Sequence, residues 1–405
     1  MNRPAAVITG LGVVGPHGIG TASLEAALLA GRPLATEIDR SEGYHDHDSS
    51  RLAALVPKLD VTPWLPPAEA RRLSVPSRFA VVAARMALAD AGIAAVDGRR
   101  VAVVLATAFG ALLFTEKLVR QILEEGPESA QPFYFSECVA NAAAARVAIA
   151  LGARGANVTI TEREAGPLLA VARGAQEVRE GRADLAIAGS AEEMTPLLHA
   201  LLDRFRSTAR AGSSVEAPRP FDAARNGVLA GEGASVCVIE REDEARARGA
   251  RLLARVAGSG AAFDSAASVS DWGDGHALLA RALRAMLARA GTDIEEIDRI
   301  VSGASGSRRG DRLESATLTA AWGGAPLPPV LTPKAVHGEF SGGMLAAAVL
   351  AAQGAPFGRP SAFATRDPAL GVAPHDGSPL AAPRRVLVTA LAPGGAAAWT
   401  LLERP

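Results

Sequence analysis

A charged turn follows one apolar segment of the chain and raises the question of what chemistry it serves. The stretch 157–189, NVTITEREAGPLLAVARGAQEVREGRADLAIAG, is typical of a buried strand, a helix and a second strand, with Glu162, Arg163 and Glu164 at the first junction. A helix N-terminus offers unpaired N–H groups and a positive dipole end, so such a junction often displays a nucleophile. Here an acid, a base and an acid occupy it. Either a site has been rebuilt at this junction, or the junction never held one.

The bulk composition limits the classes of function. The chain has 405 residues, more than the roughly 250–300 at which single cores stop growing, so we expect two core-forming halves. Its 42 basic and 43 acidic residues give a net charge of −1, which provides no overall field for nucleic acid or an anionic membrane. Cys138 and Cys237 are too few for a disulfide framework or a zinc site. The pair His45 and His47 lies in a polar stretch typical of a solvated loop, so we expect no metal site.

The N-terminal apolar run is too short to span a membrane, and no signal-peptide pattern follows it. Together with the scarcity of cysteine, this predicts a cytoplasmic protein without a membrane span.

Apolar segments typical of strands alternate with alanine-rich segments typical of helices. This alternation predicts a layered α/β fold with a mostly parallel, buried sheet. Strands are expected at 5–14, 101–107, 157–161, 184–189, 234–240, 251–258, 298–304, 328–332, 384–391 and 396–403. Helices are expected at 22–30, 77–91, 111–125, 137–151, 165–180, 276–290, 311–322 and 340–353. The Pro- and Gly-rich stretch 355–383 is expected to be a long surface loop.

Two pairs of similar segments indicate a duplicated unit. RMALADAGIAAVDGRRVAVVLATA, from Arg85, and RAMLARAGTDIEEIDRIVSGAS, from Arg284, share a helix, an Ala-Gly stop, an acidic linker and a strand. NVTITEREAGPLLAVARGAQ and PPVLTPKAVHGEFSGGMLAAAVLAAQ each combine a strand, a polar turn and an alanine-rich helix. The charged stretch 240–251 marks the boundary, although a solvated helix face explains its charges equally well. We therefore expect an N-terminal half at 1–245 and a C-terminal half at 246–405.

Two further motifs accompany the duplication. AAVITGLGVVGPHGIG lies near the N-terminus, and PRPFDAARNGVLAGEGASVCVIEREDEARARGA precedes the boundary. Together they resemble the β-ketoacyl-acyl carrier protein synthases over nearly the whole chain, most specifically at 218–233. The resemblance implies a thiolase-like fold, with duplicated α/β halves in a five-layered α-β-α-β-α arrangement.

The resembled family condenses acyl chains with one cysteine and two histidines, and this chain has none of them at the matching positions. The cysteine takes an acyl chain from a carrier protein, and its position is Glu164 here. The histidines polarise the thioester carbonyl and stabilise the enolate left when malonyl-carrier protein loses carbon dioxide. In VSGASGSRRGDRLE and TPKAVHGEF, their positions are Gly303 and Glu339. The family's supporting residues are retained, namely Lys334, Asp311 and Glu314.

Two further features concern the sequence around these positions, namely a nearby histidine and a replaced C-terminal motif. His337 lies two residues before the second histidine position. At that spacing its side chain points to a different side of a helix, so we expect His337 to be structural. The segment TALAPGGAA replaces the family's NSFGFGGTN, so Leu391 and Pro393 stand in place of its gating phenylalanines. Four catalytic elements altered together imply that this pocket does not perform the condensation.

One subgroup of the resembled family also lacks the cysteine: the chain length factors, or ketosynthase β subunits. They have Gln-Ala-Gly where this chain has Glu164-Ala165-Gly166, and PKAVHGEFSGGMLAAAVLA follows their run of small residues. The resemblance implies a non-condensing subunit that forms a heterodimer with an active ketosynthase. It would shape the tunnel for a growing chain, an aromatic polyketide or an aryl polyene, on acyl carrier protein. No cofactor of its own is implied, because phosphopantetheine arrives on the carrier protein.

Two alternatives stay open: a loading-type malonyl-carrier-protein decarboxylase, and a structural homodimer that binds acyl chains. A helix N-terminus and Arg163 both favour a carboxylate, so we expect Glu164 to be ionised. An ionised Glu164 near Glu339 would repel an enolate and a substrate carboxylate, which argues against the decarboxylase. A charge that only stabilises the helix is the other interpretation of Glu164.

The dimer interface of the resembled family surrounds the middle of its N-terminal half. The matching segments here are TAFGALLFTEKLV (107–119) and QPFYFSECVANAAAA (131–145). We expect their larger apolar residues to line an interface or tunnel, although a plain core is the alternative for any one of them. These residues are Phe109, Leu112, Phe114, Phe133, Phe135 and Cys138. A second group is either a patch that docks the carrier protein or a solvated surface: Arg154, Arg204, Arg206 and Arg210.

Overall fold

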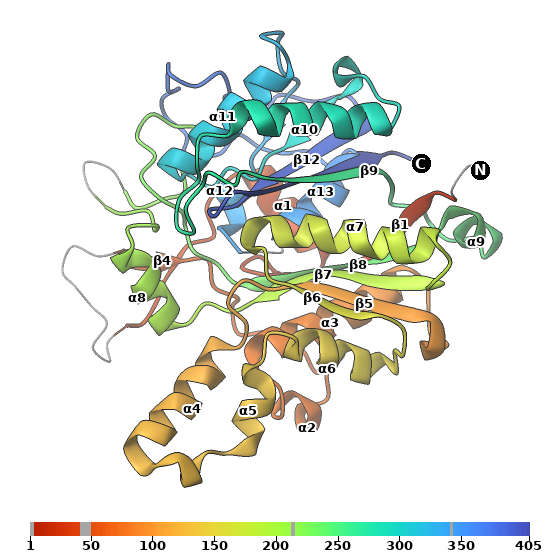
Figure 1. Ribbon diagram of the computed structural model, residues 1–405, viewed down its shortest axis with the longest axis vertical. Coiled ribbons are helices and arrows are strands. Elements are labelled where there is room, and N and C mark those ends of the chain that lie inside the picture. Colours follow the sequence, from red (N-terminus) through yellow and green to blue (C-terminus); the bar gives the residue numbers. More distant parts are fainter. Residues whose placement is uncertain (1–3, 41–49, 212–214, 341–342) are drawn as a thin grey trace.

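The computed structural model describes residues 4–40, 50–211, 215–340 and 343–405. Its main sheet contains eleven strands, in the order β11-β10-β12-β13-β9-β1-β8-β7-β5-β6, with β2 paired to β1 (Figure 1). The N-terminal strands are β1 (Ala6–Gly15), β2 (Gly18–Ile19), β5 (Val101–Ala106), β6 (Asn157–Ile160), β7 (Leu185–Glu192) and β8 (Gly233–Arg241). The C-terminal strands are β9 (Ala254–Phe263), β10 (Arg299–Val301), β11 (Val330–Leu331), β12 (Arg385–Leu391) and β13 (Ala396–Glu403). A separate pair consists of β3 (Thr36–Glu37) and β4 (Leu52–Ala53).

The two halves of the main sheet have the same topology. The order β6-β5-β7-β8-β1 in one half corresponds to β11-β10-β12-β13-β9 in the other. In both, the first three strands are parallel and the remaining pairings are antiparallel. The halves meet where Val7 and Ile8 of β1 pair with Arg255 and Ala254 of β9. The duplication inferred from sequence is therefore confirmed, while the limits 1–245 and 246–405 stay a prediction.

Helices form three layers around the two sets of strands. Figure 1 shows α10 and α11 outside the C-terminal strands, α7 and α13 between the two sets, and α3 and α6 outside the N-terminal strands. Their bounds are α3 (Val75–Asp90), α6 (Ala142–Leu151), α7 (Gly166–Arg179), α10 (His276–Arg289), α11 (Arg308–Ala321) and α13 (Gly343–Gln353). The other helices are α1 (Thr21–Ala30), α2 (Pro67–Ala70), α4 (Leu112–Glu125), α5 (Pro132–Cys138), α8 (Pro196–Arg204), α9 (Glu242–Ala247) and α12 (Lys334–His337). The expected five-layered arrangement is confirmed.

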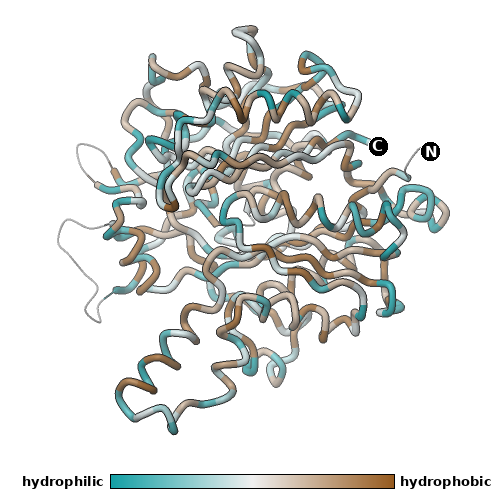
Figure 2. Tube along the Cα trace, in the orientation of Figure 1, coloured by the Kyte–Doolittle hydropathy of each residue, from teal (hydrophilic) through white to brown (hydrophobic). Residues whose placement is uncertain are grey.

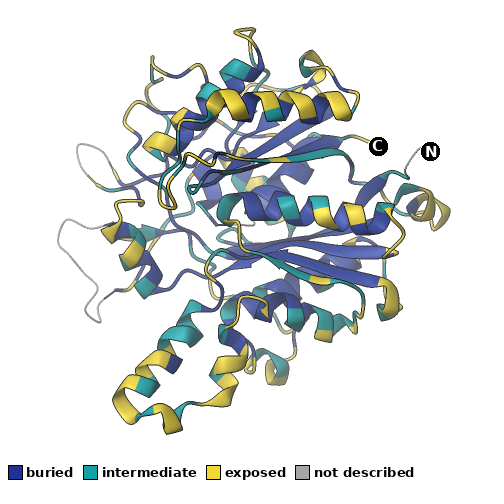
Figure 3. Ribbon diagram, in the orientation of Figure 1, coloured by how far each residue is buried: buried dark blue, intermediate teal, exposed yellow. Residues whose placement is uncertain are grey.

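The core lies between these layers. Figures 2 and 3 show apolar and buried residues along the strands, and exposed residues on the outer faces of the helices. The central helix α13 is buried along its length up to Gln353, because it is covered from both sides. Its sequence GMLAAAVLAAQ suits this position, since small apolar side chains allow the two sets of strands to approach it closely.

All ten strands expected from the sequence are present, but the expectation of a mostly parallel sheet was wrong, because more of its pairings are antiparallel than parallel. Some helical predictions were also wrong in detail. The expected helix 137–151 is two elements, since α5 ends at Cys138 and α6 begins at Ala142. Helix α8 was missed, although Thr195 and Pro196 gave the signal: the Thr195 hydroxyl accepts a hydrogen bond from the Leu198 amide at 3.1 Å. The stretch 355–383 has no helix or strand, yet it is not only a surface loop, because Phe357, Leu370 and Val372 in it are buried.

Candidate functional site

Three charged side chains from separate segments meet inside the protein where β6 leads into α7. Glu164 belongs to a short 3-10 helix, η3 (Arg163–Ala165), directly before α7, and Lys334 and Glu339 lie at and just beyond α12. Lys334 Nζ donates to Glu339 Oε2 at 2.6 Å, and the Lys334 side chain is 2% exposed. Glu339 and Lys334 are also the charges that act most strongly on Glu164. The fold thus brings together two of the positions predicted to have lost a catalytic residue.

The protonation of Glu164 differs from the sequence-based expectation. Burial raises the pKa of Glu164 to about 7, the negative charge of Glu339 adds to the rise, and Lys334 and Arg163 only partly oppose it. Glu164 keeps some exposed surface, but its carboxyl oxygen Oε2 is enclosed, without a hydrogen-bond partner among the described residues. The expectation that the helix N-terminus and Arg163 would dominate and favour the carboxylate was therefore wrong. Desolvation outweighs the helix N-terminus and Arg163, so a large share of the carboxyl is protonated near neutral pH.

Glu339 is the partner in this electrostatic pair. Burial raises its pKa, while the adjacent Lys334 ammonium acts in the opposite direction. Its Oε1 is enclosed without a partner in the described part of the chain. The Lys334 ammonium therefore acts on Glu164, Glu339 and Glu314, and one cation among several carboxyl groups favours keeping a proton on the Glu164–Glu339 pair.

Gly303, the third degenerate position, lies just beyond the end of β10 where the chain leaves no room for a side chain. A Cβ atom there would be 2.8 Å from the Thr389 carbonyl oxygen and 3.2 Å from Ala390 Cα, both on β12. The first distance is shorter than Cβ atoms tolerate, and the obstacle is backbone rather than a flexible side chain. An imidazole at residue 303 would require β12 to move.

The retained acids hold the segment around Gly303. Glu314 accepts hydrogen bonds from Ser302 Oγ at 2.7 Å and Gly303 N at 3.1 Å, and also from the Thr389 hydroxyl. Asp311 likewise accepts from main-chain amides, those of Phe221 at 2.8 Å and of Ser305 and Gly306 at 3.2 Å each. Burial raises the pKa of Asp311 to about 7. Both acids bind the polypeptide backbone on the inside of the protein.

His337 is buried and packed rather than directed at a ligand. Its Nδ1 is 3.0 Å from the Gly338 carbonyl oxygen, and its ring lies edge-on against Phe340 at 5.6 Å between centroids. Burial lowers the pKa of His337 to about 3, so the imidazole is neutral at physiological pH. This packing is what a structural residue requires.

The expected interface residues lie on an arm, which we define as residues 107–140 and which includes α4 and α5. Figure 1 shows α4 and α5 projecting from the body, and Figure 3 shows their exposed outer faces. Phe109 is 44% exposed, Phe133 38% and Phe135 64%, so the plain-core alternative is wrong for these three. Phe114 packs between Phe133 and Tyr134, with centroid distances of 5.5 and 5.2 Å. Leu112 and Cys138 are partly buried.

Exposed apolar surface continues beyond these residues. The arm also exposes Val119, Leu123 and Val139, and the neighbouring helix α6 exposes Ile149. Strand β6 is the last strand in the order of the sheet, and it is joined to the base of the arm because the Thr107 amide donates to the Ile160 carbonyl at 3.0 Å. Clustered apolar residues of this kind on one side of a protein mark an interaction surface.

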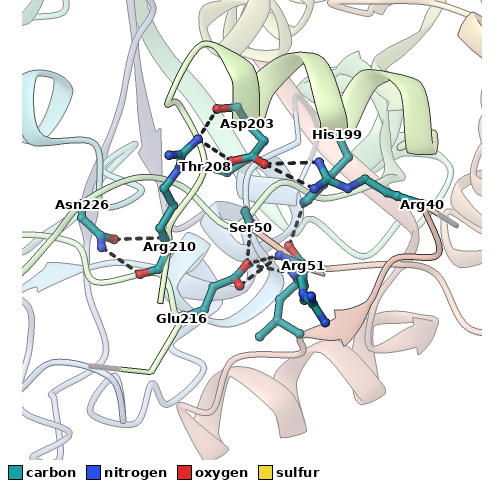
Figure 4. Close-up of polar contacts among 10 residues, drawn as sticks. Arg40, Ser50, Arg51, His199, Asp203, Thr208, Arg210, Glu216 and Asn226 are labelled. Atoms are coloured by element: carbon teal, nitrogen blue, oxygen red, sulfur yellow. Dashed lines mark hydrogen bonds and ion pairs between the residues drawn. The ribbon is translucent and has the colours of Figure 1, made fainter. Parts of the chain in front are cut away.

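The arginines considered as a docking patch do not form one group. Arg210 Nη2 contacts Asp203 Oδ1 at 2.7 Å, and the buried Arg40 contacts Asp203 Oδ2 at 3.3 Å (Figure 4). Thr208 also donates to Asp203, so Arg210 belongs to an internal network below α8. Arg154, Arg204 and Arg206 are exposed. Their role in docking stays a prediction.

Two further expectations concern metals and membranes. Within the described residues, no group of three or more His, Cys, Asp or Glu is arranged to hold a metal ion, and the His45–His47 stretch lies outside them. In the same part of the chain, no helix is both long and apolar enough to cross a membrane.

The duplicated α-β-α-β-α body, with charged side chains gathered where β6 leads into α7, defines the class of thiolase-like ketosynthase folds. Residues 4–245 match the family model described as beta-ketoacyl synthase, N-terminal domain, and residues 253–353 match the C-terminal domain. The chain belongs to the beta-ketoacyl synthase family.

The similar proteins include both 3-oxoacyl-[acyl-carrier-protein] synthase 2 of Vibrio cholerae, 29% identical with 84% of this chain and 83% of that protein covered, and subunits of polyketide systems. The chain is 31% identical over 360 residues to the granaticin polyketide putative beta-ketoacyl synthase 1 of Streptomyces violaceoruber, covering 85% of each chain. The ishigamide ketosynthase/chain length factor structure superposes with a TM-score of 0.89 at 30% identity, covering 100% of both chains. A complex of a type II polyketide synthase acyl-carrier protein with its ketosynthase, AntDE:AntF, has a TM-score of 0.89 with full coverage, but at 22% identity it shows the fold alone. The chain is thus similar to ketosynthase and chain length factor subunits.

Proposed function

We propose that this chain is a non-condensing, chain-length-factor-like subunit that pairs with an active ketosynthase and shapes the tunnel for a polyketide or polyene chain. The observation that carries the proposal is the Glu164–Lys334–Glu339 cluster, together with a Gly303 at which a side chain would clash with the backbone of β12. A carboxyl group forms no thioester with a carrier protein, and neither Gly303 nor Glu339 supplies an imidazole. The chain therefore has a ketosynthase fold without the groups for condensation.

The exposed apolar arm supports a heterodimer. Phe109, Phe133 and Phe135 project from the body where the resembled family builds its dimer interface. A stable obligate pair buries about 2,000 Å² or more, mostly apolar at its centre. The structure named as the ishigamide ketosynthase/chain length factor is an example of such a pair. An active ketosynthase is accordingly the proposed partner.

The proposed second partner is an acyl carrier protein, which would bring the growing chain on its own phosphopantetheine. The AntDE:AntF complex contains such a carrier protein with its ketosynthase. This chain would need no cofactor of its own. We place the pair in the cytoplasm, as the scarcity of cysteine suggests.

The raised pKa of Glu164 bears on the alternative of a malonyl decarboxylase. A protonated Glu164 repels an enolate less than a carboxylate does, so one objection from the sequence is weaker. Decarboxylation still requires hydrogen-bond donors at the enolate oxygen. Lys334 is bound to Glu339 and the Gly303 amide is bound to Glu314, so of these groups only the O–H of a protonated Glu164 is left where the family uses two imidazoles. The geometry therefore favours the subunit without chemistry.

Chain length in the reconstituted heterodimer tests the proposal. Phe109→Ala and Phe114→Ala should each lengthen the products, because extending the chain against a bulky wall costs about 1–3 kcal/mol, or roughly one to two decades in rate. Glu164→Ala should leave the distribution nearly unchanged. Phe205→Ala is the matched control, since this phenylalanine is 75% exposed and directly follows α8, outside the arm.

The products would be identified by liquid chromatography and mass spectrometry. Unchanged chain lengths at reduced yield in the Phe109 and Phe114 variants, together with lost turnover in Glu164→Ala, would contradict the proposal. The pocket rather than the tunnel would then carry the function, as a decarboxylase requires.

A further inference from the structure

We infer that Glu192 and Glu193, at the carboxyl end of β7, are positioning residues that fix the base of the arm and thereby set where Phe109 and Phe114 lie. The consequence for chain length rests on the proposed function. The anchoring itself is a property of this chain and can be tested separately.

Glu192 binds the segment that leads into the arm. It is 2% exposed, and its Oε2 accepts from the Ala108 amide at 2.6 Å. Its Oε1 accepts from the Phe109 amide and from the Thr107 hydroxyl, both at 3.1 Å. The Thr107 oxygen in turn accepts from the Gly110 amide at 3.1 Å. One carboxylate thus fixes the backbone on both sides of Ala108 and at Phe109 itself.

Glu193 takes the place of the missing N-cap of α4. The N-cap residue is Ala111, whose side chain cannot accept a hydrogen bond, and the first turn of the helix contains no acidic residue. Glu193, 1% exposed, instead accepts from the Leu113 amide at 2.6 Å. A carboxylate beside unpaired N–H groups at a helix N-terminus is stabilising. A residue eighty positions away in the sequence therefore decides where α4 begins and points.

The energetic cost of this arrangement argues for a specific role. Burial raises the pKa of Glu193 to about 7, and the neighbouring Glu232 and Glu192 add to the rise. Burying a carboxyl group is costly, and both Glu192 and Glu193 accept hydrogen bonds from amides at the base of the arm. Glu232 is a useful contrast, because it accepts from Val56 and Met194, outside the arm.

These contacts hold the arm at its base, where it joins the body of the protein. Glu192 acts on Phe109 directly, and Glu193 acts on Leu113, next to Phe114. Farther along the arm, Phe114 packs against Phe133 and Tyr134 of α5, and Lys117 Nζ lies 6.0 Å from its ring centroid. Loosening either carboxylate should therefore shift both phenylalanines together without removing their side chains.

Hydrogen exchange of the full-length chain, alone and in its heterodimer, tests the anchoring. Glu193→Ala should speed exchange at the Leu113 amide by about tenfold or more, since a lost charge-assisted hydrogen bond is worth that much. Glu193→Gln keeps an acceptor and should restore most of the protection. Glu124→Ala is the matched control, because Glu124 lies on the same helix with a 62% exposed side chain. Protection at Leu113 that is unchanged in Glu193→Ala would overturn the inference.

Product analysis of the same heterodimers tests the consequence. Glu192→Gln and Glu193→Ala should broaden the chain-length distribution, whereas a merely structural role would lower yield at a constant distribution. Faster exchange with an unchanged distribution would overturn the inferred link to chain length while leaving the anchor intact. If Phe109→Ala and Phe114→Ala also leave the distribution unchanged, the proposed tunnel fails rather than the anchor.

Discussion

Replacing Glu164 by glutamine should make this protein more stable at alkaline pH, the reverse of what losing a helix N-terminal charge would do. Glutamine has the shape of the protonated acid but cannot ionise. The Glu164 pKa is raised from 4.5 to about 7 in the folded protein, because burial and Glu339 disfavour its charge. A raised folded pKa gives stability that is fully present below the unfolded value of 4.5 and is lost as the pH rises through about 7.

The size of the effect follows from the shift. One pKa unit corresponds to about 1.4 kcal/mol, so the rise from 4.5 to about 7 costs the wild type roughly 3 kcal/mol once Glu164 is ionised. Most of this cost, about 2–3 kcal/mol, develops between pH 5 and 8. Relative to the wild type, the free energy of unfolding of Glu164→Gln should therefore rise by that amount across this range.

The assay is denaturant unfolding of both proteins from pH 5 to 8.5, with Glu162→Gln as the matched control. Glu162 stands two residues away in the same turn but is exposed, so its variant should follow the wild type at every pH. Difference infrared spectroscopy near pH 6 should also show a protonated carboxyl band that Glu164→Gln lacks. A Glu164→Gln protein that is less stable than the wild type at pH 8 would refute the reasoning, because the carboxylate would then be stabilising.

Three further outcomes are expected. Intact-protein mass spectrometry of the chain after incubation with acyl-carrier protein should show no acyl adduct, and a stoichiometric adduct would end the proposal of a non-condensing subunit. Glu164→Cys alone should not condense substrates, because the thiol would still face Gly303 and Glu339; measurable condensation in a radiolabel assay would show that another group replaces the histidines. Lys334→Met should lower the free energy of unfolding at pH 7 by about 3–5 kcal/mol, since it leaves Glu339 buried without its cation, and an unchanged denaturation midpoint would contradict the buried ion pair.

The strand pattern and the repeat were readable from the sequence for a simple reason. Strands buried on both faces have continuous apolar runs, such as VAVVLA at 101–106 and RVLVTAL at 385–391, so periodicity located them without tertiary information. Elements that are marked only by short sequence signals were harder to predict. Helix α8 begins at a Thr-Pro pair, and the break between α5 and α6 depends on how the arm folds back onto α3.

The identities at Glu164, Gly303 and Glu339 were enough to predict that cysteine and histidine chemistry is absent, because no conformation turns a carboxylate into a thiol. Only the tertiary structure decided how these residues behave. Enclosure of Glu164 beside Glu339 raised its pKa to about 7, against the expectation from sequence, since desolvation grows with burial and burial is a property of the whole fold. The backbone of β12 leaves no space for a side chain at residue 303. The Glu193 carboxylate, just beyond β7, binds the start of α4 from eighty residues away. Contacts between residues that lie so far apart in the sequence leave no local sequence pattern. They are therefore visible only in the folded structure.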